Sequence, residues 1–196
     1  MATPSYVTYN PNAGASAPVV SMGSGNAPNP VAIHILSSAE IALIQGNDPN
    51  SILVDTTTSP PSVIANANYW AQFGATWIAR QINIVAQGYK AAISAPYAFT
   101  NSAGVASSYA MDSDSKFIYS NAYISYVLGA QPLPSGFTIR DVNNVPQAFT
   151  VADIKTFYLG AVDFFQTCNA AFNTLEANIK ASTSLSQCQS YIWVTP

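Results

Sequence analysis

The residues that could do chemistry are few and stand far apart. The chain has one histidine, His34. A serine hydrolase needs a histidine as proton acceptor, and a metalloenzyme needs clustered histidines, cysteines or carboxylates. His34 belongs to no such pattern, and it alternates with the apolar Ile33 and Ile35. We therefore expect His34 to face solvent from a strand and not to act as a ligand.

The carboxylates also form no catalytic pattern. Asp112 and Asp114 lie in a Ser-rich turn and could bind calcium if further oxygens converged, but the twelve-residue loop pattern of calcium sites is missing. We favour helix capping, with a helix starting near Asp112 or Asp114 and Asp114 as the cap. Asp163 and Glu176 form no evident acid–base pair of the glycosidase kind. We expect no catalytic residue, no cofactor and no metal, and hence no enzyme.

Two cysteines, Cys168 and Cys188, are too sparse for a disulfide scaffold or a zinc site. Their helical context could nevertheless bring them together. Reduced thiols in the core are the simpler expectation, and the sequence leaves open whether the two are bonded.

Charge is scarce along the whole chain of 196 residues. Charged residues make up 8% of it, against about 25% in ordinary globular domains. The lysines and arginines are scattered singly, so no basic patch is available for nucleic acid or anionic lipid, and polar residues interrupt every long apolar stretch. Such a surface is either covered by neutral polar residues or buried against partners. We favour burial against partners and expect a homo-oligomer. We expect it neither to bind nucleic acid nor to insert into membranes.

The elements that would carry these residues fall into three segments. Residues 1–30, rich in Pro, Gly, Asn, Ala and Ser, predict an extended docking arm that its own domain or a neighbouring subunit must order. Residues 31–65 predict a small α/β module. It consists of a strand over 31–36, a short helix through Ile44 opened by the capping-box spacing from Ser37 to Glu40, and a strand over 52–54.

Residues 66–196 predict a helical domain with a β-hairpin. One helix is expected over about 68–93, and a second begins near residue 112. A hairpin over 137–149 turns at Asn143-Asn144. The second helix draws its apolar content from Phe117, Ile118, Tyr123, Ile124, Val127 and Leu128. The fold class is therefore α+β.

The longest helix of this domain begins at Thr150, which has capping-box spacing to Asp153. Ordering its backbone costs about 1–2 kcal/mol per residue, so the helix needs partners. These are either the earlier helices of the same chain or equivalent helices of a symmetric oligomer. The packing or interface stripe recurs at helical spacing: Ile154, Tyr158, Phe165, Phe172, Leu175 and Ile179.

The many aromatic side chains could line a sugar-binding surface, since their faces stack on pyranose rings. Most of them fall on helical stripes, where core packing explains them. Three lie in the loop 94–110, with Tyr97 and Phe99 on a possible edge strand. They remain candidates for receptor contact: Tyr97, Phe99 and Tyr109.

The order of motifs from about residue 70 onward is distinctive. A helix leads to an extended segment with Tyr109, then to Ser113-Asp114 and a helix, then to a strand pair, a Thr150-x-x-Asp153 helix start and a closing Trp193. This order resembles a domain of unknown function that recurs near the C-termini of bacteriophage tail-fibre and tail-associated proteins. The N-terminal third, with Tyr6-Val-Thr-Tyr, resembles the short strand-helix-strand leader of phage tail-fibre proteins.

The resemblance implies a virion part and not an enzyme. We expect a structural component of a bacteriophage virion, a tail-fibre or baseplate subunit that binds other tail or baseplate proteins and is assembled in the host cytoplasm. Two alternatives stay open. One is a fibre assembly chaperone that is absent from the virion, and the other is a receptor module that binds glycans.

Overall fold

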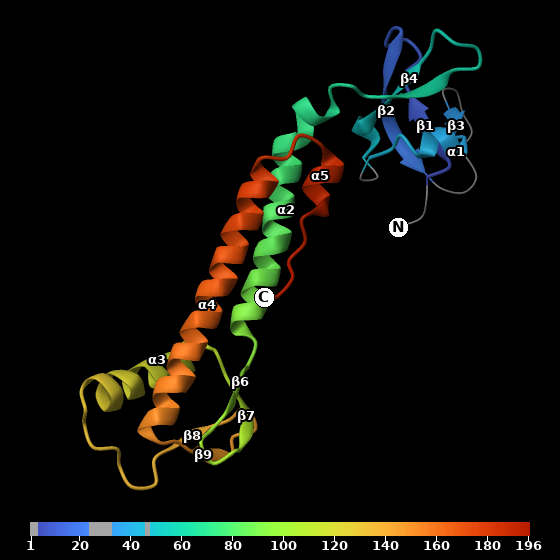
Figure 1. Cartoon of the computed structure of the whole chain (residues 1–196). Coiled ribbons are helices and arrows are strands. Elements are labelled where there is room, and N and C mark those ends of the chain that lie inside the picture. Colours follow the sequence, from blue (N-terminus) through green and yellow to red (C-terminus); the bar gives the residue numbers. More distant parts are fainter. Residues whose placement is uncertain (1–3, 24–32, 46–47) are drawn as a thin grey trace. The chain divides into compact units, whose positions relative to one another are not determined.

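The computed structural model describes residues 4–23, 33–45 and 48–196 (Figure 1). Helices account for 47% of the residues and strands for 20%, which confirms the predicted α+β fold class. The chain forms two compact units, Met1–Arg80 with Ser182–Ser190, and Gln81–Ala181 with Tyr191–Pro196. The long helix α2 (Tyr69–Ser94) begins in the first unit and ends in the second.

The first unit is built on a curled, five-stranded antiparallel sheet with strand order β3-β1-β2-β4-β5. Alternate residues of these strands point to one face and form its core, including Val7, Val19, Ile52 and Val54. The strands are β1 (Tyr6–Tyr9), β2 (Ser16–Gly23), β3 (Ile33–Ile35), β4 (Ile52–Asp55) and β5 (Ser62–Ala65).

Where the structure describes the predicted docking arm, its own domain orders it, which is one of the two alternatives that the sequence left open. Its described residues, 4–23, hold β1 and β2, and Val7 and Ala17 are completely buried. Strand β2 pairs with β4, more than thirty positions along the chain, as Ala17 opposite Val54 shows. Local composition cannot report such a distant partner, and the remaining residues of the predicted arm lie outside the described part of the chain.

The predicted strand-helix-strand module is present, with two differences. Helix α1 (Ser38–Ile41) ends before Ile44, and a further strand, β5, follows β4, although the predicted module has no strand after 52–54. Ser37 caps α1 in a capping box with Glu40, as predicted. The unit also contains two short helices, η1 (Pro49–Ser51) and α5 (Leu185–Ser190).

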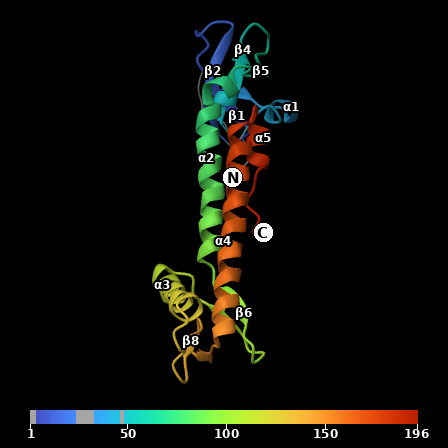
Figure 2. The same ribbon diagram turned by 60° about the vertical axis from the view of Figure 1, so that its left-hand side comes forward.

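The second unit is built on the C-terminal part of α2 and on α4 (Val151–Lys180), which run side by side in both views (Figures 1 and 2). The ring of Tyr89 on α2 stacks on that of Phe172 on α4, with centroids 5.1 Å apart. At one end of α4 lie α3 (Ser113–Ala122), its continuation as the π-helical turn η2 (Tyr123–Leu128), and two hairpins. The hairpins pair β6 (Tyr97–Thr100) with β7 (Ala106–Tyr109), and β8 (Thr138–Arg140) with β9 (Pro146–Ala148).

The core of this unit is aromatic. The Phe157 ring is the shared centre, and the rings of Tyr109, Tyr119 and Phe149 meet it nearly edge to face at centroid distances of 5.1, 4.9 and 5.7 Å. Such geometry places the positive edge of one ring on the negative face of another. The cluster fixes the hairpins and α3 against the beginning of α4.

Local signals place the helix ends and turns. Thr150 caps α4 in a capping box with Asp153, as the sequence predicts. The cap of α3 is Asp112 and not Asp114, because Asp112 has the extended backbone of a cap and its carboxylate accepts from the Ser115 N–H. The β8–β9 turn contains Asn144 with φ 64°, a left-handed conformation that asparagine tolerates.

The last residues follow α2 within the second unit. Residues 191–196 form neither helix nor strand. Gln81 Nε2 donates to the Tyr191 carbonyl at 2.7 Å, and the Trp193 ring meets the Tyr89 ring edge on, with centroids 5.7 Å apart. Gln81 is buried, so this bond satisfies a polar group inside the unit.

Candidate functional site

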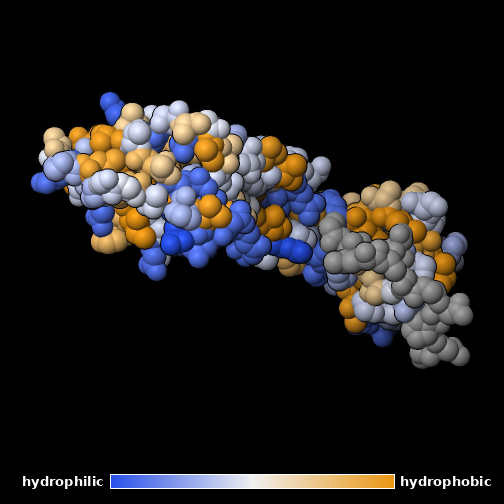
Figure 3. Space-filling model, turned by 90° about the horizontal axis from the view of Figure 1, so that it is seen from below, coloured by the Kyte–Doolittle hydropathy of each residue, from blue (hydrophilic) through white to orange (hydrophobic). Residues whose placement is uncertain are grey.

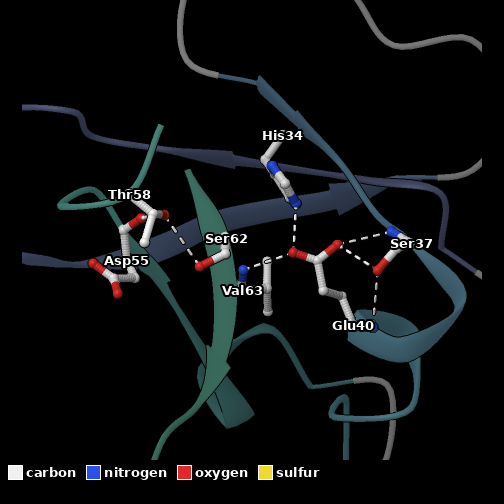
Figure 4. A network of polar contacts seen from close by, with 7 residues as sticks. All are labelled: His34, Ser37, Glu40, Asp55, Thr58, Ser62 and Val63. Atoms are coloured by element: carbon white, nitrogen blue, oxygen red, sulfur yellow. Dashed lines mark hydrogen bonds and ion pairs between the residues drawn. The ribbon is translucent and has the colours of Figure 1, made fainter. Parts of the chain in front are cut away.

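Glu40 is the centre of the best-connected polar cluster of the first unit (Figure 4). One carboxylate oxygen accepts from His34 Nε2 and from the Val63 N–H, both at 2.7 Å. The other oxygen accepts from the Ser37 N–H at 2.8 Å and from the Ser37 hydroxyl at 2.7 Å. The three elements that meet here are β3, α1 and β5.

These contacts keep the Glu40 carboxyl ionised. Burial by itself raises its pKa, but the hydrogen bonds from the Ser37 and Val63 N–H groups, the Ser37 hydroxyl and His34 outweigh it and lower the pKa to about 2. An ionised carboxylate only accepts hydrogen bonds, so His34 carries its hydrogen on Nε2. The Glu40 carboxylate therefore stays ionised near neutral pH and accepts hydrogen bonds from groups of β3, β5 and the start of α1.

The expected solvent position of His34 is wrong. Its side chain is 14% exposed, whereas the neighbouring Ile35 is 64% exposed. Because side chains alternate along a strand, either His34 or Ile35 must face inward. His34 takes the inward position, where it forms a hydrogen bond with Glu40. Glu40 thereby links β3 and β5, which are the two edge strands of the curled sheet.

A second carboxylate ties elements together in the other unit. Asp153 is buried and accepts from the Thr150 N–H at 2.8 Å, the Thr150 hydroxyl at 2.7 Å, the Ser102 N–H at 2.7 Å and the Ser102 hydroxyl at 2.8 Å. Burial raises the pKa of Asp153, and these hydrogen bonds outweigh it and lower the pKa. The side chain joins the start of α4 to the turn between β6 and β7. The capping-box spacing predicted its bond to Thr150, but no sequence signal pointed to Ser102.

Neither carboxylate belongs to a metal cluster. Within residues 4–23, 33–45 and 48–196, no group of three or more His, Cys, Asp or Glu side chains could hold a metal ion. Asp112 is occupied as a helix cap, and Asp114 is exposed in the first turn of α3. The two cysteines are free and buried, Cys168 in the second unit and Cys188 in the first, and burial raises the pKa of both thiols.

The predicted receptor-contact residues belong to the core. Tyr109 is completely buried, and Tyr97 and Phe99 are half-buried and pack on Phe157. A side chain without exposed surface cannot touch a receptor, so Tyr109 is corrected to a packing residue. The aromatic side chains of this hairpin were predicted as exposed because the sequence shows a loop there and not the aromatic cluster beneath it.

Most of the predicted stripe of α4 is covered within the chain. Ile154 and Ile179 are buried, Tyr158 stacks on Tyr123 with ring centroids 4.3 Å apart, and Phe172 stacks on Tyr89. The half-buried Leu175 completes the stripe. Packing inside the chain therefore accounts for most of this stripe. Phe165 differs because it lines a groove.

A groove lies between α3 and α4 beside Phe165. It encloses about 350 Å³ and is lined largely by apolar side chains, among them Phe117, Tyr158, Val162 and Phe165. The ammonium group of Lys116 lies over the Phe165 ring, 4.4 Å from its centroid, and donates to the Ile93 carbonyl at 3.3 Å. The groove is therefore a largely apolar surface with one cation, Lys116, in its lining.

The outer side of α3 and η2 is apolar and uncovered. Phe117 is 67% and Leu128 66% exposed, and both belong to the apolar content that we predicted for this helix. Ile118 and Ile124 are also more than half exposed. Phe117, Ile124 and Leu128 recur at steps of seven and four, which places them along one side of the helix. We call the four residues Phe117, Ile118, Ile124 and Leu128 the α3 ridge.

Comparisons with known proteins give the chain no relatives: no family model, no curated protein and no solved structure matches it. Fold and site together define an α+β protein whose two best-connected carboxylates, Glu40 and Asp153, fasten structural elements to one another. Among the described residues, no helix is both long and apolar enough to cross a membrane.

Proposed function

We propose that this chain is a structural component of a bacteriophage virion, a tail-fibre or baseplate subunit that acts by assembling with other protein subunits. The observation that carries the proposal is the large amount of apolar side chain at the surface of both units. Val20 and Ile35 are exposed on the first unit, and Phe117 and Leu128 on the second. Figure 3 shows such hydrophobic residues among polar ones on one face of the molecule.

Association is the physical outcome that such a surface favours. Removing apolar surface from water contributes roughly 25 cal/mol per Å². Large exposed apolar patches mark interaction sites in soluble proteins. Few charges oppose close contact, since Asp, Glu, Lys and Arg together make up 8% of the chain. We therefore expect another protein subunit to bury these exposed apolar side chains.

The polar clusters also support a structural role. The carboxylates of Glu40 and Asp153 accept hydrogen bonds from backbone N–H groups and hydroxyls of neighbouring elements. A lowered carboxyl pKa is frequent at catalytic sites, but structural networks lower it equally. With every oxygen of both carboxylates engaged in this way, their contribution is rigidity.

The assignment to a phage tail comes from the resemblance of residues 70 onward to the domain found in tail-fibre and tail-associated proteins. The residues that carry this resemblance have defined places in the fold. Asp112 and Ser113 start α3, Thr150 and Asp153 start α4, and Trp193 packs on α2. The motif order thus follows the order of structural elements.

Purified particles test the proposal. Phage grown with the tagged chain are banded on a density gradient, and the chain is quantified by mass spectrometry against the major capsid protein. We expect its peptides in the particle band at a constant ratio to capsid peptides. A chain found in the lysate but missing from the band would instead be an assembly chaperone, and the proposed virion role would be wrong.

A further inference from the structure

The α3 ridge and the groove meet at Phe117. Phe117 belongs to both, because it lines the groove and is 67% exposed. The ridge projects from α3 and η2, while Tyr158, Val162 and Phe165 of α4 form the far wall of the groove. Protrusion and hollow therefore lie next to each other within a single unit of the molecule.

We infer that this surface binds a second copy of the same chain about a two-fold axis, with Phe117 of each copy entering the groove of the other. The inference deepens the proposed function and rests on it, because it names one surface through which the subunit assembles. A two-fold interface requires a patch that is complementary to itself, so that each residue pair occurs twice. A ridge beside a groove meets this requirement.

The charges at this surface favour a second copy over another occupant. Lys116 borders the groove, and among the described residues it has no carboxylate partner. Asp114, two positions earlier, is exposed and likewise forms no ion pair within the described part of the chain. The Lys116 ammonium contacts the Phe165 ring and the Ile93 carbonyl, but both of these partners are uncharged. A second copy related by a two-fold axis near Phe117 would supply Asp114 for Lys116 and Lys116 for Asp114, which gives each of the four charges an opposite partner.

The rest of the surface is uncharged. No Asp, Glu, Lys or Arg occurs between Lys116 and Arg140, a segment that includes the whole α3 ridge. Nucleic acid and anionic membranes bind through clusters of basic residues, and Lys116 is the single cation that lines the groove. A neutral protein face, such as the same ridge on another copy, is the matching partner.

The first test measures self-association of the full chain. Sedimentation equilibrium from micromolar concentrations to about 1 mM covers the weak end of specific affinities. We expect a dimer whose dissociation constant rises at least about tenfold in Phe117→Ser, because an aromatic side chain is lost from the centre of the interface. The matched control is Val194→Ser, which removes an apolar side chain that is 70% exposed and lies in neither the α3 ridge nor the groove, and it should leave the dimer unchanged.

The second test uses the predicted ion pairs. Lys116→Glu and Asp114→Lys each create repulsion in a two-fold dimer, so each variant alone should dimerise more weakly than the wild type. An equal mixture of the two variants restores opposite charges at both pairs, so we expect it to form a heterodimer. Circular dichroism melting curves confirm that each variant is folded, and recovery in the mixture cannot come from a folding defect.

Three results would overturn the inference: a wild-type chain that remains monomeric to about 1 mM, a Phe117→Ser variant that dimerises as well as the wild type, or a mixture that fails to associate. Binding of the wild type to neutral phosphatidylcholine vesicles, lost in Phe117→Ser, would assign the ridge to a lipid surface and also contradict it. These outcomes are separate from the virion test, because a chain can be present in particles and yet make no contact with its own copies.

Discussion

Glu40 is the residue whose loss should most disturb the first unit. Its side chain fastens the two edge strands of the sheet to α1 through four hydrogen bonds. Replacing Glu40 with Gln keeps the shape but removes the charge, and it turns one acceptor into a donor that faces other donors. Because hydrogen bonds to charged groups contribute about 1.5–3 kcal/mol each, we expect Glu40→Gln to lower the free energy of unfolding by about 1–3 kcal/mol.

Urea denaturation followed by circular dichroism measures this change. Glu176→Gln is the matched control, because Glu176 is bonded to Lys180 in an exposed i,i+4 pair of α4 that contributes little. Equal losses in the two variants would mean that the Glu40 cluster has no special structural role.

The same carboxyl makes stability depend on acid. The pKa of Glu40 is lowered from 4.5 to about 2 in the folded chain, so the unfolded chain takes up a proton first. The stabilisation is therefore fully present above about pH 4.5 and is lost as the pH falls through about 2. We expect the wild type to lose unfolding free energy across this window and Glu40→Gln to lose less. Parallel urea titrations at several pH values compare them, and identical slopes would contradict the assignment.

Phe157 should be the most costly single truncation in the second unit. It is buried, and its ring makes edge-to-face contacts with the rings of Tyr109, Tyr119 and Phe149. Phe157→Ala leaves a cavity that these rings cannot close, and such changes cost about 3–5 kcal/mol. Thermal melting measures the loss, with Leu159→Ala as the control, because Leu159 lies on the same helix and is exposed. A melting temperature equally affected by both changes would disprove the central place of Phe157.

At the scale of elements, the helix starts are set by short-range chemistry. Thr150 accepts from the Asp153 N–H, and its own N–H donates to the Asp153 carboxylate. We expect Thr150→Ala to lower the stability of the second unit by about 1 kcal/mol, as for other lost caps. Thr156→Ala, at an exposed position inside α4, is the control and should be neutral or slightly stabilising. Denaturant midpoints for the two variants decide between these outcomes.

Whether the sequence could predict an element depends on how far apart along the chain its interacting residues lie. The capping boxes at Ser37 and Thr150 and the period of α4 involve residues within four positions, and these elements lie where the sequence places them. The five-stranded sheet depends on partners far apart, such as Ala17 opposite Val54, so its N-terminal strands were taken for an extended arm. Local patterns report local bonds, and strand pairing is largely non-local.

The candidate sites follow the same rule. The contact of Asp153 with Ser102 crosses about fifty positions, and the contact of Glu40 with Val63 crosses about twenty. Neither could be predicted from spacing. The apolar content of α3 and η2 was recognised, but the sequence alone could not show that Phe117 and Leu128 would remain exposed. Burial depends on which other element covers a helix side, and here no described element covers the ridge.

At the scale of the whole molecule, the distribution of charge and apolar surface is the property from which function is proposed. Few ionised side chains and several exposed apolar ones are unfavourable for a freely diffusing protein and favourable for a subunit. The carboxylates inside each unit hold strands and helix starts in place. Rigid units with apolar outer surfaces suit stable assembly.

Hydroxyl-radical footprinting tests this account most directly, because it reports which side chains a partner covers. Oxidation of Phe117 and Leu128 is compared between the isolated chain, kept dilute enough to be monomeric, and purified phage particles. The account predicts that both residues are oxidised readily in the isolated chain and are protected in the particle, while buried Phe157 is protected in both. Equal oxidation of Phe117 and Leu128 in the two samples, or particles that lack the chain, would contradict it.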